Sequence, residues 1–224
     1  MDKKEFWQKT KAALKKTWFF IWEEDSLWSW IVNIVLAIII VKFLVYPGLG
    51  LMLGTQFPIV AVVSNSMEHK LSDGQVCGKN VINYKSDFDN YWKVCGDWYE
   101  QRNLTKDKFS DWSLKNGFNK GDIMILKSKK PEKINIGDVI VFSAKRPDIK
   151  PEPIIHRVVA KTYINGTYYF TTKGDWNSDT INDNVISEKN ISQDRILGNA
   201  FIRVPLLGYL KIVFVEFIGL FKAG

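Results

Sequence analysis

The sequence predicts a mainly β protein in which one antiparallel β domain follows an N-terminal transmembrane helix. One long apolar run stands near the start of the chain, at residues 27–47. Short β-branched segments, separated by Gly, Asp and Pro, fill most of the chain after this run. Such strands without long intervening helices are typical of antiparallel sheets. The 224 residues suit one domain beside an anchor, because a domain generally takes about 100–200 residues.

The run at 27–47 is predicted to be a retained membrane anchor. Its residues LWSWIVNIVLAIIIVKFLVY, as a helix, reach about 30 Å, which is the thickness of a hydrocarbon core. Only Asn33 and Lys42 are strongly polar, and Lys42 is near the end, where it can reach the headgroups. We expect Pro47 and Gly48 to end the helix. The run is too long for a cleaved leader, and no small-residue cleavage pattern comes after it.

The charge distribution predicts the orientation of the anchor. Six lysines precede the run: Lys3, Lys4, Lys9, Lys11, Lys15 and Lys16. Positive flanks generally stay in the cytoplasm, so residues 1–26 are expected to form a cytoplasmic amphipathic segment, and the rest to lie on the extracytoplasmic face of the cell membrane. The chain has a net charge of +7, but these lysines have the placement of a cytoplasmic flank and not of a basic binding groove, so a nucleic-acid-binding function is disfavoured. The apolar end, 204–224, is expected to be a membrane-associated or second transmembrane helix.

The body, residues 55–203, is expected to form the β domain. Six segments are predicted as strands: PIVAVVS, DIMILKS, GDVIVFSA, PIIHRVVAK, TYYFTTKGD and ILGNAFIRV.

An insertion at 78–120 is polar, aromatic and poor in strand pattern, with room for a short helix within 89–109. It forms either a lid over a substrate groove or a cover for a sheet edge, and a structural role is favoured. Cys77 and Cys95 form either a disulfide, in an oxidising compartment, or two buried thiols.

A serine and a histidine are the candidates for chemistry. Ser66 comes after the first predicted strand, in the segment SNSME, and a nucleophilic serine needs a nearby base. The chain has only two histidines. His69 is expected on a surface loop, whereas His156 stands in the predicted strand IIHRVV, which can hold an imidazole rigidly opposite a loop serine. His156 is therefore the preferred base.

Five segments in order resemble the signal peptidase I family. SNSME is similar to the serine box, and GDIMILKS and GDVIVF are similar to the paired Gly-Asp strand starts. PIIHRVV resembles the base-bearing strand of the archaeal and endoplasmic-reticulum (Ser-His) branch, where bacterial relatives carry a lysine. TKGDWN and ILGNAFIRVPLLGY resemble the Gly-Asp box and the closing strand. The resemblance implies an antiparallel β catalytic domain of signal-peptidase type, and a membrane-bound serine endopeptidase that removes signal peptides from exported preproteins.

The resemblance also implies roles for individual residues. Ser66 is the nucleophile and His156 the base. Ser64 either supports the oxyanion with its hydroxyl or is an ordinary strand-end serine. Asp175 matches the first acid of the Gly-Asp box. The segment WNSDTINDNV departs from the family spacing, so two residues are candidates for the second acid. Asp183 is preferred to orient His156, and Asp179 is the alternate.

The expected partners are preproteins, the lipid bilayer and protein-export machinery, and no cofactor or metal is expected. Intact Ser66 and His156 favour an active enzyme, while the irregular acid segment favours, weakly, an inactive homologue that acts as a binding or complex subunit. A thiol or redox protein is disfavoured, because Cys77 and Cys95 are far apart in sequence and no CxxC motif is present.

Overall fold

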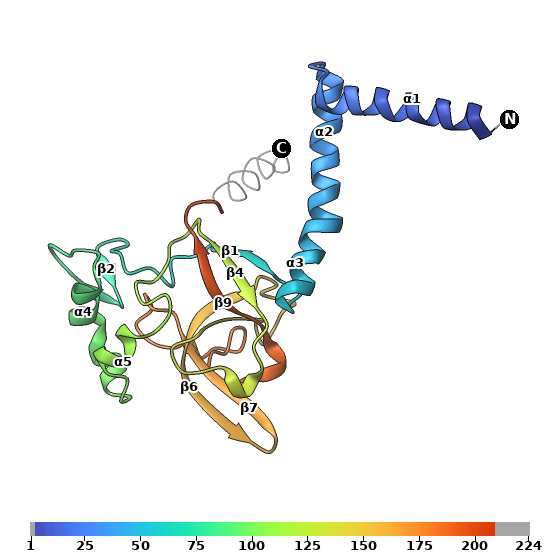
Figure 1. The fold of residues 1–224 in the computed structure, drawn as a ribbon. Helices are drawn as coiled ribbons and strands as arrows, with labels where there is room; N and C mark the ends of the chain where they lie inside the picture. The colour runs from blue at the N-terminus through green and yellow to red at the C-terminus, as the bar shows by residue number, and fades with distance from the viewer. Residues whose placement is uncertain (1–2, 209–224) are drawn as a thin grey trace. The chain divides into compact units, whose positions relative to one another are not determined.

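The computed structural model describes residues 3–208, and the chain divides into two compact units, Met1–Met52 and Leu53–Gly224. The second unit holds the β domain and every candidate residue for chemistry, from Ser64 to Asp183. Figure 1 labels the helices of both units and several strands of the second.

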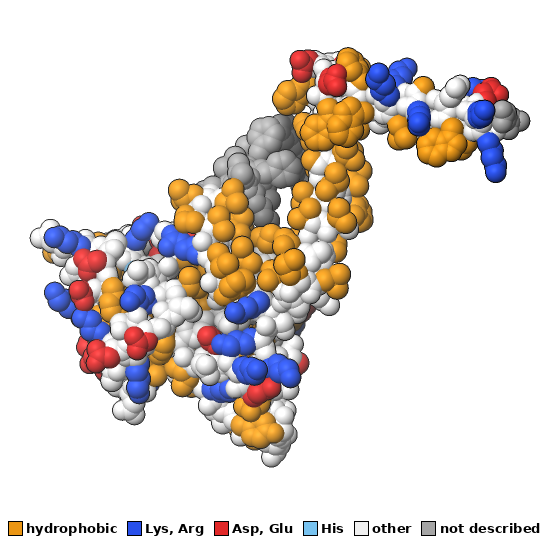
Figure 2. All heavy atoms as spheres, in the orientation of Figure 1, with side chains coloured by type: hydrophobic (Ala, Val, Ile, Leu, Met, Phe, Trp, Pro, Cys, Tyr) orange, Lys and Arg blue, Asp and Glu red, His pale blue; other side chains and the backbone are white. Residues whose placement is uncertain are grey.

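The first unit is helical. Helix α1 covers Lys3–Trp22 and α2 covers Leu27–Ile40; a π-helical turn at Val41–Val45 and helix α3 at Tyr46–Leu53 continue α2. The hydroxyl of Ser26 caps α2 by accepting a hydrogen bond from the Ser29 N–H. By length and composition, Leu27–Leu53 is able to cross a membrane, with a mean hydropathy of 2.4. Figure 2 shows hydrophobic side chains over the visible face of this helix and lysines along α1.

The expected end of the helix at Pro47–Gly48 was wrong. The helix continues through both residues to Leu53. Proline lacks the N–H of a regular helical turn, and its ring crowds the carbonyl of the preceding turn. The π-helical turn at Val41–Val45 ends two residues before Pro47, and such wider turns commonly accompany an irregularity in a long helix.

Two polar side chains of α2 bind the end of α1. The Ser29 hydroxyl donates to the Phe20 carbonyl at 2.6 Å, and the Asn33 Nδ2 donates to the Ile21 carbonyl at 2.9 Å. The last carbonyls of a helix have no partner within it, and in an apolar setting such unpaired groups are costly. This contact explains why a strongly polar residue, Asn33, interrupts the apolar run.

The second unit is built on a seven-stranded antiparallel sheet, which confirms the mainly β class. The strand order is β1-β4-β9-β5-β6-β7-β8. The strands are β1 (Ile59–Ala61), β4 (Ile123–Lys127), β5 (Val139–Phe142), β6 (Ile154–Ile164), β7 (Thr167–Lys173), β8 (Ile191–Ser192) and β9 (Ile196–Val204). Six of them match the predicted segments; the two-residue β8 is too short for its pattern to be recognised. Beyond Val204, the expected C-terminal helix lies mostly outside the described residues.

Strands β6 and β7 form the hairpin that organises the site. Asn165 and Gly166 connect them, with φ values of 47° and 82°, as a two-residue hairpin turn requires. Along β6, His156 and Arg157 point to opposite faces because side chains alternate along a strand. In register, His156 lies opposite Ile140 on β5, and Arg157 lies opposite Lys173 on β7. One strand therefore supplies a polar side chain to each face of the sheet.

The insertion folds as a small helical unit with its own core. It contains β3 (Lys79–Asn80), α4 (Phe88–Glu100) and α5 (Lys106–Ser110), and it comes after β2 (Gln75–Val76). Asp87 caps α4 and Thr105 caps α5. Its buried aromatic residues include Tyr91, Tyr99 and Phe109, which pack against Val159 of β6. Cys77 and Cys95 form a disulfide, so the alternative of two free thiols is wrong.

Candidate active site

Ser66 lies on a loop after β1 and is fixed from two sides. The Trp176 N–H donates to the Ser66 carbonyl at 2.9 Å, and the Phe118 N–H donates to the Met67 carbonyl at 3.0 Å. The Met67 side chain is fully buried in the core, and its sulfur accepts from the Asp175 N–H. Met67 is therefore a packing residue of the core. These contacts fix the backbone on both sides of the Ser66 side chain.

His156 reaches Ser66 from the sheet. Its Nε2 lies 2.8 Å from the Ser66 Oγ, although the two residues are 90 positions apart in sequence. The segment after β7 packs closely against both, and a Cβ at Gly174 would lie 2.7 Å from the Ser66 carbonyl and 2.9 Å from Nε2. Any side chain at position 174 would push the serine and the histidine apart. This steric limit explains why glycine is required at position 174.

A carboxylate completes the series on the other side of the imidazole. The His156 Nδ1 is in hydrogen-bond contact with Glu188 Oε1, and Glu188 is fully buried. The same Oε1 accepts from the Thr172 hydroxyl at 3.0 Å, and Oε2 accepts from the Ile181 N–H at 2.5 Å. Because an ionised carboxylate only accepts, Nδ1 carries the proton and Nε2 accepts from the Ser66 hydroxyl.

The predicted aspartates of the irregular segment lie elsewhere. Asp183 accepts from the backbone N–H groups of Val185 and Ile186, as a capping residue of its own loop. Asp179 accepts from the Trp98 Nε1–H at 2.9 Å and from the Thr180 N–H. Neither carboxylate binds the His156 Nδ1, which contacts Glu188 instead. The expected pairing of His156 with Asp183 or Asp179 was therefore wrong. The physical reason is local: short Asp side chains satisfy nearby backbone donors in turns.

Asp175 is the centre of a second buried cluster. Arg157 donates to both of its oxygens, at 2.9 and 2.7 Å, and the His69 Nε2 lies 3.0 Å from Oδ2. Burial alone would raise the pKa of Asp175, but the Arg157 charge and the hydrogen bonds from His69 and Arg157 outweigh it, and the pKa is well below its ordinary value. The Tyr99 hydroxyl also donates to Oδ1. This carboxylate therefore holds the loop after β7 in place.

His69 is buried in this cluster, so its expected place on a surface loop was wrong. Its ring stacks on Tyr91, with centroids 3.5 Å apart and planes inclined by 2°. Burial lowers the pKa of His69 more than the hydrogen bond to Asp175 raises it. Lys173 is buried nearby, and burial lowers its pKa to about 8. Its Nζ donates to the Gly174 carbonyl, so it too contacts the loop after β7.

Ser64 lies beside the candidate nucleophile. The two hydroxyl oxygens are 3.1 Å apart. Since the Ser66 hydroxyl hydrogen is directed to His156, the Ser64 hydroxyl donates in this pair. Ser64 is exposed and Ser66 is half-buried, so a substrate carbonyl is able to approach the serine pair from solvent.

Glu188 is the site residue that the sequence did not reveal. It stands in SEKN, a polar segment directly before β8, with the composition of a solvated turn. Its burial depends on tertiary contacts with Thr172 and Ile181, which no local pattern signals. The one signal in the sequence was the irregular spacing of the preceding aspartates, since neither Asp179 nor Asp183 has the separation that is usual in the family.

Fold and site together define a mainly β protein with a Ser–His–Glu series and a candidate membrane helix. No family model matches the chain. It is 29% identical over 106 residues to the signal peptidase complex catalytic subunit sec11 of Neurospora crassa, and 31% identical over 106 residues to the SEC11 subunit of Fusarium vanettenii. The match covers 46% of this chain and 60% of each relative.

The chain thus has homologues in the endoplasmic-reticulum-type signal peptidase I family, as the ordered motifs predicted. The matched region spans about 60% of the length of the curated relatives. Because the match is partial, the activity and assembly of these relatives are proposals for this chain.

Proposed function

We propose that this protein is a membrane-bound serine endopeptidase that removes signal peptides from exported preproteins. One observation carries the proposal: the Ser66 Oγ lies 2.8 Å from the His156 Nε2, and Glu188 binds Nδ1 of the same ring. A nucleophile, a base and a group that orients the base, in hydrogen-bond contact in series, are the arrangement of serine acyl transfer. The relatives named as catalytic subunits of signal peptidase complexes support the substrate class.

In the proposed reaction, His156 takes the Ser66 proton as Oγ attacks the scissile carbonyl carbon. The tetrahedral intermediate collapses when the imidazolium gives that proton to the leaving amine, which breaks the C–N bond and leaves an acyl-Ser66 ester. Water, deprotonated by His156, then attacks the ester, and the proton returns to Oγ as the acid product leaves. Glu188 keeps the required tautomer and stabilises the imidazolium in both halves of the reaction.

The oxyanion of the tetrahedral intermediate needs donors beside Ser66. We assign the Ser66 backbone N–H and the Ser64 hydroxyl, which already donates toward the Ser66 Oγ. Loss of one such donor costs about 10²–10³-fold in kcat when the donor is essential. If kcat is nearly unchanged in a Ser64→Ala variant, the Ser64 hydroxyl is not an essential oxyanion donor and the Ser66 backbone N–H is left in that role.

Asp175 is assigned a positioning role, not proton transfer. Its carboxylate is fully committed to Arg157, His69 and Tyr99. Its backbone N–H contacts Met67, and the next residue, Trp176, contacts the Ser66 carbonyl. It therefore supports the loop that fixes the nucleophile.

The substrate is proposed to bind as an extended strand. β1 lies at one end of the sheet and leads directly into the Ser66 loop, so main-chain pairing along it would bring a scissile bond to the serine. Small residues at the first and third positions before the cut are expected, as in the A-x-A-like pattern.

The membrane setting is part of the proposal. Leu27–Leu53 anchors the chain, the lysine-rich N-terminus stays in the cytoplasm, and the β domain works on the extracytoplasmic face of the cell membrane. Anchoring confines enzyme and substrate to one surface, which raises their effective concentration. Protein-export machinery is the expected partner that delivers the substrate.

Cleavage of a preprotein by the purified full-length protein in liposomes tests the proposal. We expect one cut after a small residue, and Ser66→Ala and His156→Ala should each lower the rate by at least about 10³-fold. The matched control is Ser110→Ala, which removes a serine hydroxyl that donates to the Asp107 carbonyl within α5, and it should retain cleavage. A Ser66→Ala variant with the wild-type rate would contradict the proposal.

A further inference from the structure

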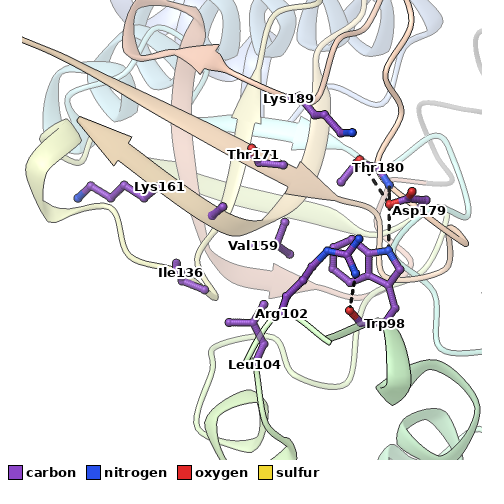
Figure 3. Close-up of a pocket in the computed structure, with 11 residues that line it drawn as sticks. Trp98, Arg102, Leu104, Ile136, Val159, Lys161, Thr171, Asp179, Thr180 and Lys189 are labelled. Carbon is purple, nitrogen blue, oxygen red and sulfur yellow. Dashed lines mark hydrogen bonds between the residues drawn. The ribbon is translucent and has the colours of Figure 1, made fainter. Parts of the chain in front are cut away.

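The loop that carries Glu188 is fixed to the insertion by a side-chain contact. Trp98, on α4, donates from Nε1 to Asp179 Oδ1 at 2.9 Å. Trp98 and Asp179 both line a cavity of about 480 Å³. Figure 3 shows the bond between them, and the Asp179 oxygen also accepts from the Thr180 N–H. Asp179 is largely exposed, and its slight burial raises its pKa less than the hydrogen bonds from Thr180 and Trp98 lower it. The ionised carboxylate is thus the acceptor.

The residues after Asp179 lead directly to the acid. The Ile181 N–H donates to Glu188 Oε2 at 2.5 Å, and the Glu188 N–H donates to the Ile181 carbonyl at 2.8 Å. Only Thr180 separates Asp179 from Ile181. The other oxygen of the same carboxylate, Oε1, contacts the His156 Nδ1. A continuous series of contacts therefore joins the indole of the insertion to the imidazole.

Trp98 is itself held firmly. The Arg102 guanidinium lies 3.7 Å from its ring centroid and donates to its backbone carbonyl at 2.8 Å. Trp98 also packs nearly at right angles against Tyr99, which is fully buried and binds Asp175. The insertion is thus a rigid support, and its contact with Asp179 fixes a loop that is otherwise exposed between residues 179 and 184 in most positions.

We propose that Trp98 and Asp179 are positioning residues that hold Ile181, and through it Glu188, in the geometry required to orient His156. The expected changes in kcat rest on the proposed function. The claim that Trp98 and Asp179 fix the position of Glu188 does not depend on that function. It gives the insertion a specific task, which is to fix the acid-bearing loop. It also gives Asp179 a role at a distance from the reacting atoms, through Ile181 and Glu188 to His156.

The test compares two tryptophans of the same helix in the full-length protein. Trp98→Phe deletes the bond to Asp179 and retains an aromatic ring. Trp92→Phe is the matched control, because the Trp92 Nε1–H donates to Glu100, within α4 and away from the acid loop. We expect Trp98→Phe to lower kcat about 3- to 10-fold with KM unchanged, as loss of one hydrogen bond generally does. Trp92→Phe should leave kcat within about twofold.

A second pair of variants separates positioning from folding. Asp179→Asn keeps an oxygen acceptor and should retain most of kcat, whereas Asp179→Ala should match Trp98→Phe. The double variant Trp98→Phe/Asp179→Ala should be no worse than either single variant, because both remove the same contact. Additive losses, or equal losses for Trp92→Phe and Trp98→Phe, would overturn the proposal.

A readout without turnover distinguishes this inference from the proposed function. The His156 Nδ1–H is identifiable by NMR, since the chain has only one other histidine, and its proton shift reports the bond to Glu188. The chemical shift of this proton should change in Trp98→Phe and in Asp179→Ala, and it should be unchanged in Trp92→Phe. If it moves as expected while the wild type cleaves no preprotein, the positioning inference stands and the proposed function fails. If the shift is the same in all variants, the positioning inference fails whatever the cleavage result.

Discussion

At the scale of single residues, Glu188 has the burial and the donors that a charged partner of His156 requires. A buried carboxylate is stable only when several donors surround it. Glu188 contacts the His156 Nδ1 and is also held by Thr172 and Ile181. Asp183, the candidate preferred from the sequence for this place although its segment departs from the family spacing, has a shorter side chain and serves its own turn.

Glu188→Gln is expected to lower kcat by on the order of 10³–10⁴-fold. The amide keeps the size of the side chain but offers a donor where the imidazole requires an acceptor, which favours the wrong tautomer. The matched control is Asp183→Asn, which should stay within about twofold because its oxygen can still cap the loop. Preprotein cleavage under saturating substrate measures both. A large loss for Asp183→Asn together with a small one for Glu188→Gln would restore the aspartate assignment.

Asp175 is expected to make stability depend on pH. Its pKa is lower in the folded protein than in the unfolded chain, so it contributes stability that is present above about pH 4 and lost as the pH falls through the folded value. Asp175→Asn should cost about 3–5 kcal/mol at pH 7, because it leaves Arg157 buried without its counter-charge.

Denaturant titrations from pH 7 to pH 2.5 check this expectation. The difference between Asp175→Asn and the wild type should shrink as the pH falls, since protonated Asp175 is as neutral as asparagine. The control Asp89→Asn affects an exposed ion pair with Lys106 and should change stability by less than about 0.5 kcal/mol throughout. A difference that stays constant with pH would contradict the assigned role of the Asp175 charge.

At the scale of elements, the long strands and the place of the insertion were predictable, but the contacts of the insertion with the β domain were not. β6 and β7 combine β-branched residues with an Asn-Gly turn, which is a strong local signal for a hairpin. The insertion depends on contacts between residues far apart, such as Tyr91 with Asp175, which only the folded chain brings together. Ser66 and His156 lie in segments whose order resembles a known family, so the sequence indicated them. Glu188 is brought to the site only by contacts between distant residues, so the sequence did not indicate it.

The Cys77–Cys95 disulfide ties the insertion to the loop beside the site. The Cys77 N–H donates to the Trp176 carbonyl, and the Trp176 N–H donates to the Ser66 carbonyl. Closing a segment with a separation of 18 residues stabilises a protein by about 3 kcal/mol in the chain-entropy description. We therefore expect a loss of that size in Cys77→Ala/Cys95→Ala, measured by denaturant unfolding.

The control for the disulfide is treatment with a reductant. It should destabilise the wild type by a similar amount and leave the double alanine variant unchanged. Equal stability of oxidised and reduced wild type would show that the cross-link contributes nothing to the fold.

At the scale of the whole molecule, the chain combines an apolar helix with a β domain that carries a Ser–His–Glu series. The contact between α1 and α2 accounts for the polar residues in the apolar helix, because Ser29 and Asn33 donate hydrogen bonds to the last carbonyls of α1. The β domain explains how residues 66, 156 and 188 meet: the Ser66 loop and His156 of β6 meet beside Gly174, and the segment before β8 brings Glu188 to the same histidine. The proposed activity therefore depends on Ser66 being a nucleophile activated by its neighbours.

Covalent labelling of Ser66 tests this claim most directly. The intact protein in liposomes is treated with a serine-reactive fluorophosphonate, and the modified peptide is located by mass spectrometry. We predict one adduct on Ser66, absent in His156→Ala and strongly slowed in Glu188→Gln, with the neighbouring Ser64 unmodified. Labelling of Ser64 in place of Ser66, or equal labelling of Ser66 with and without His156, would contradict the claim.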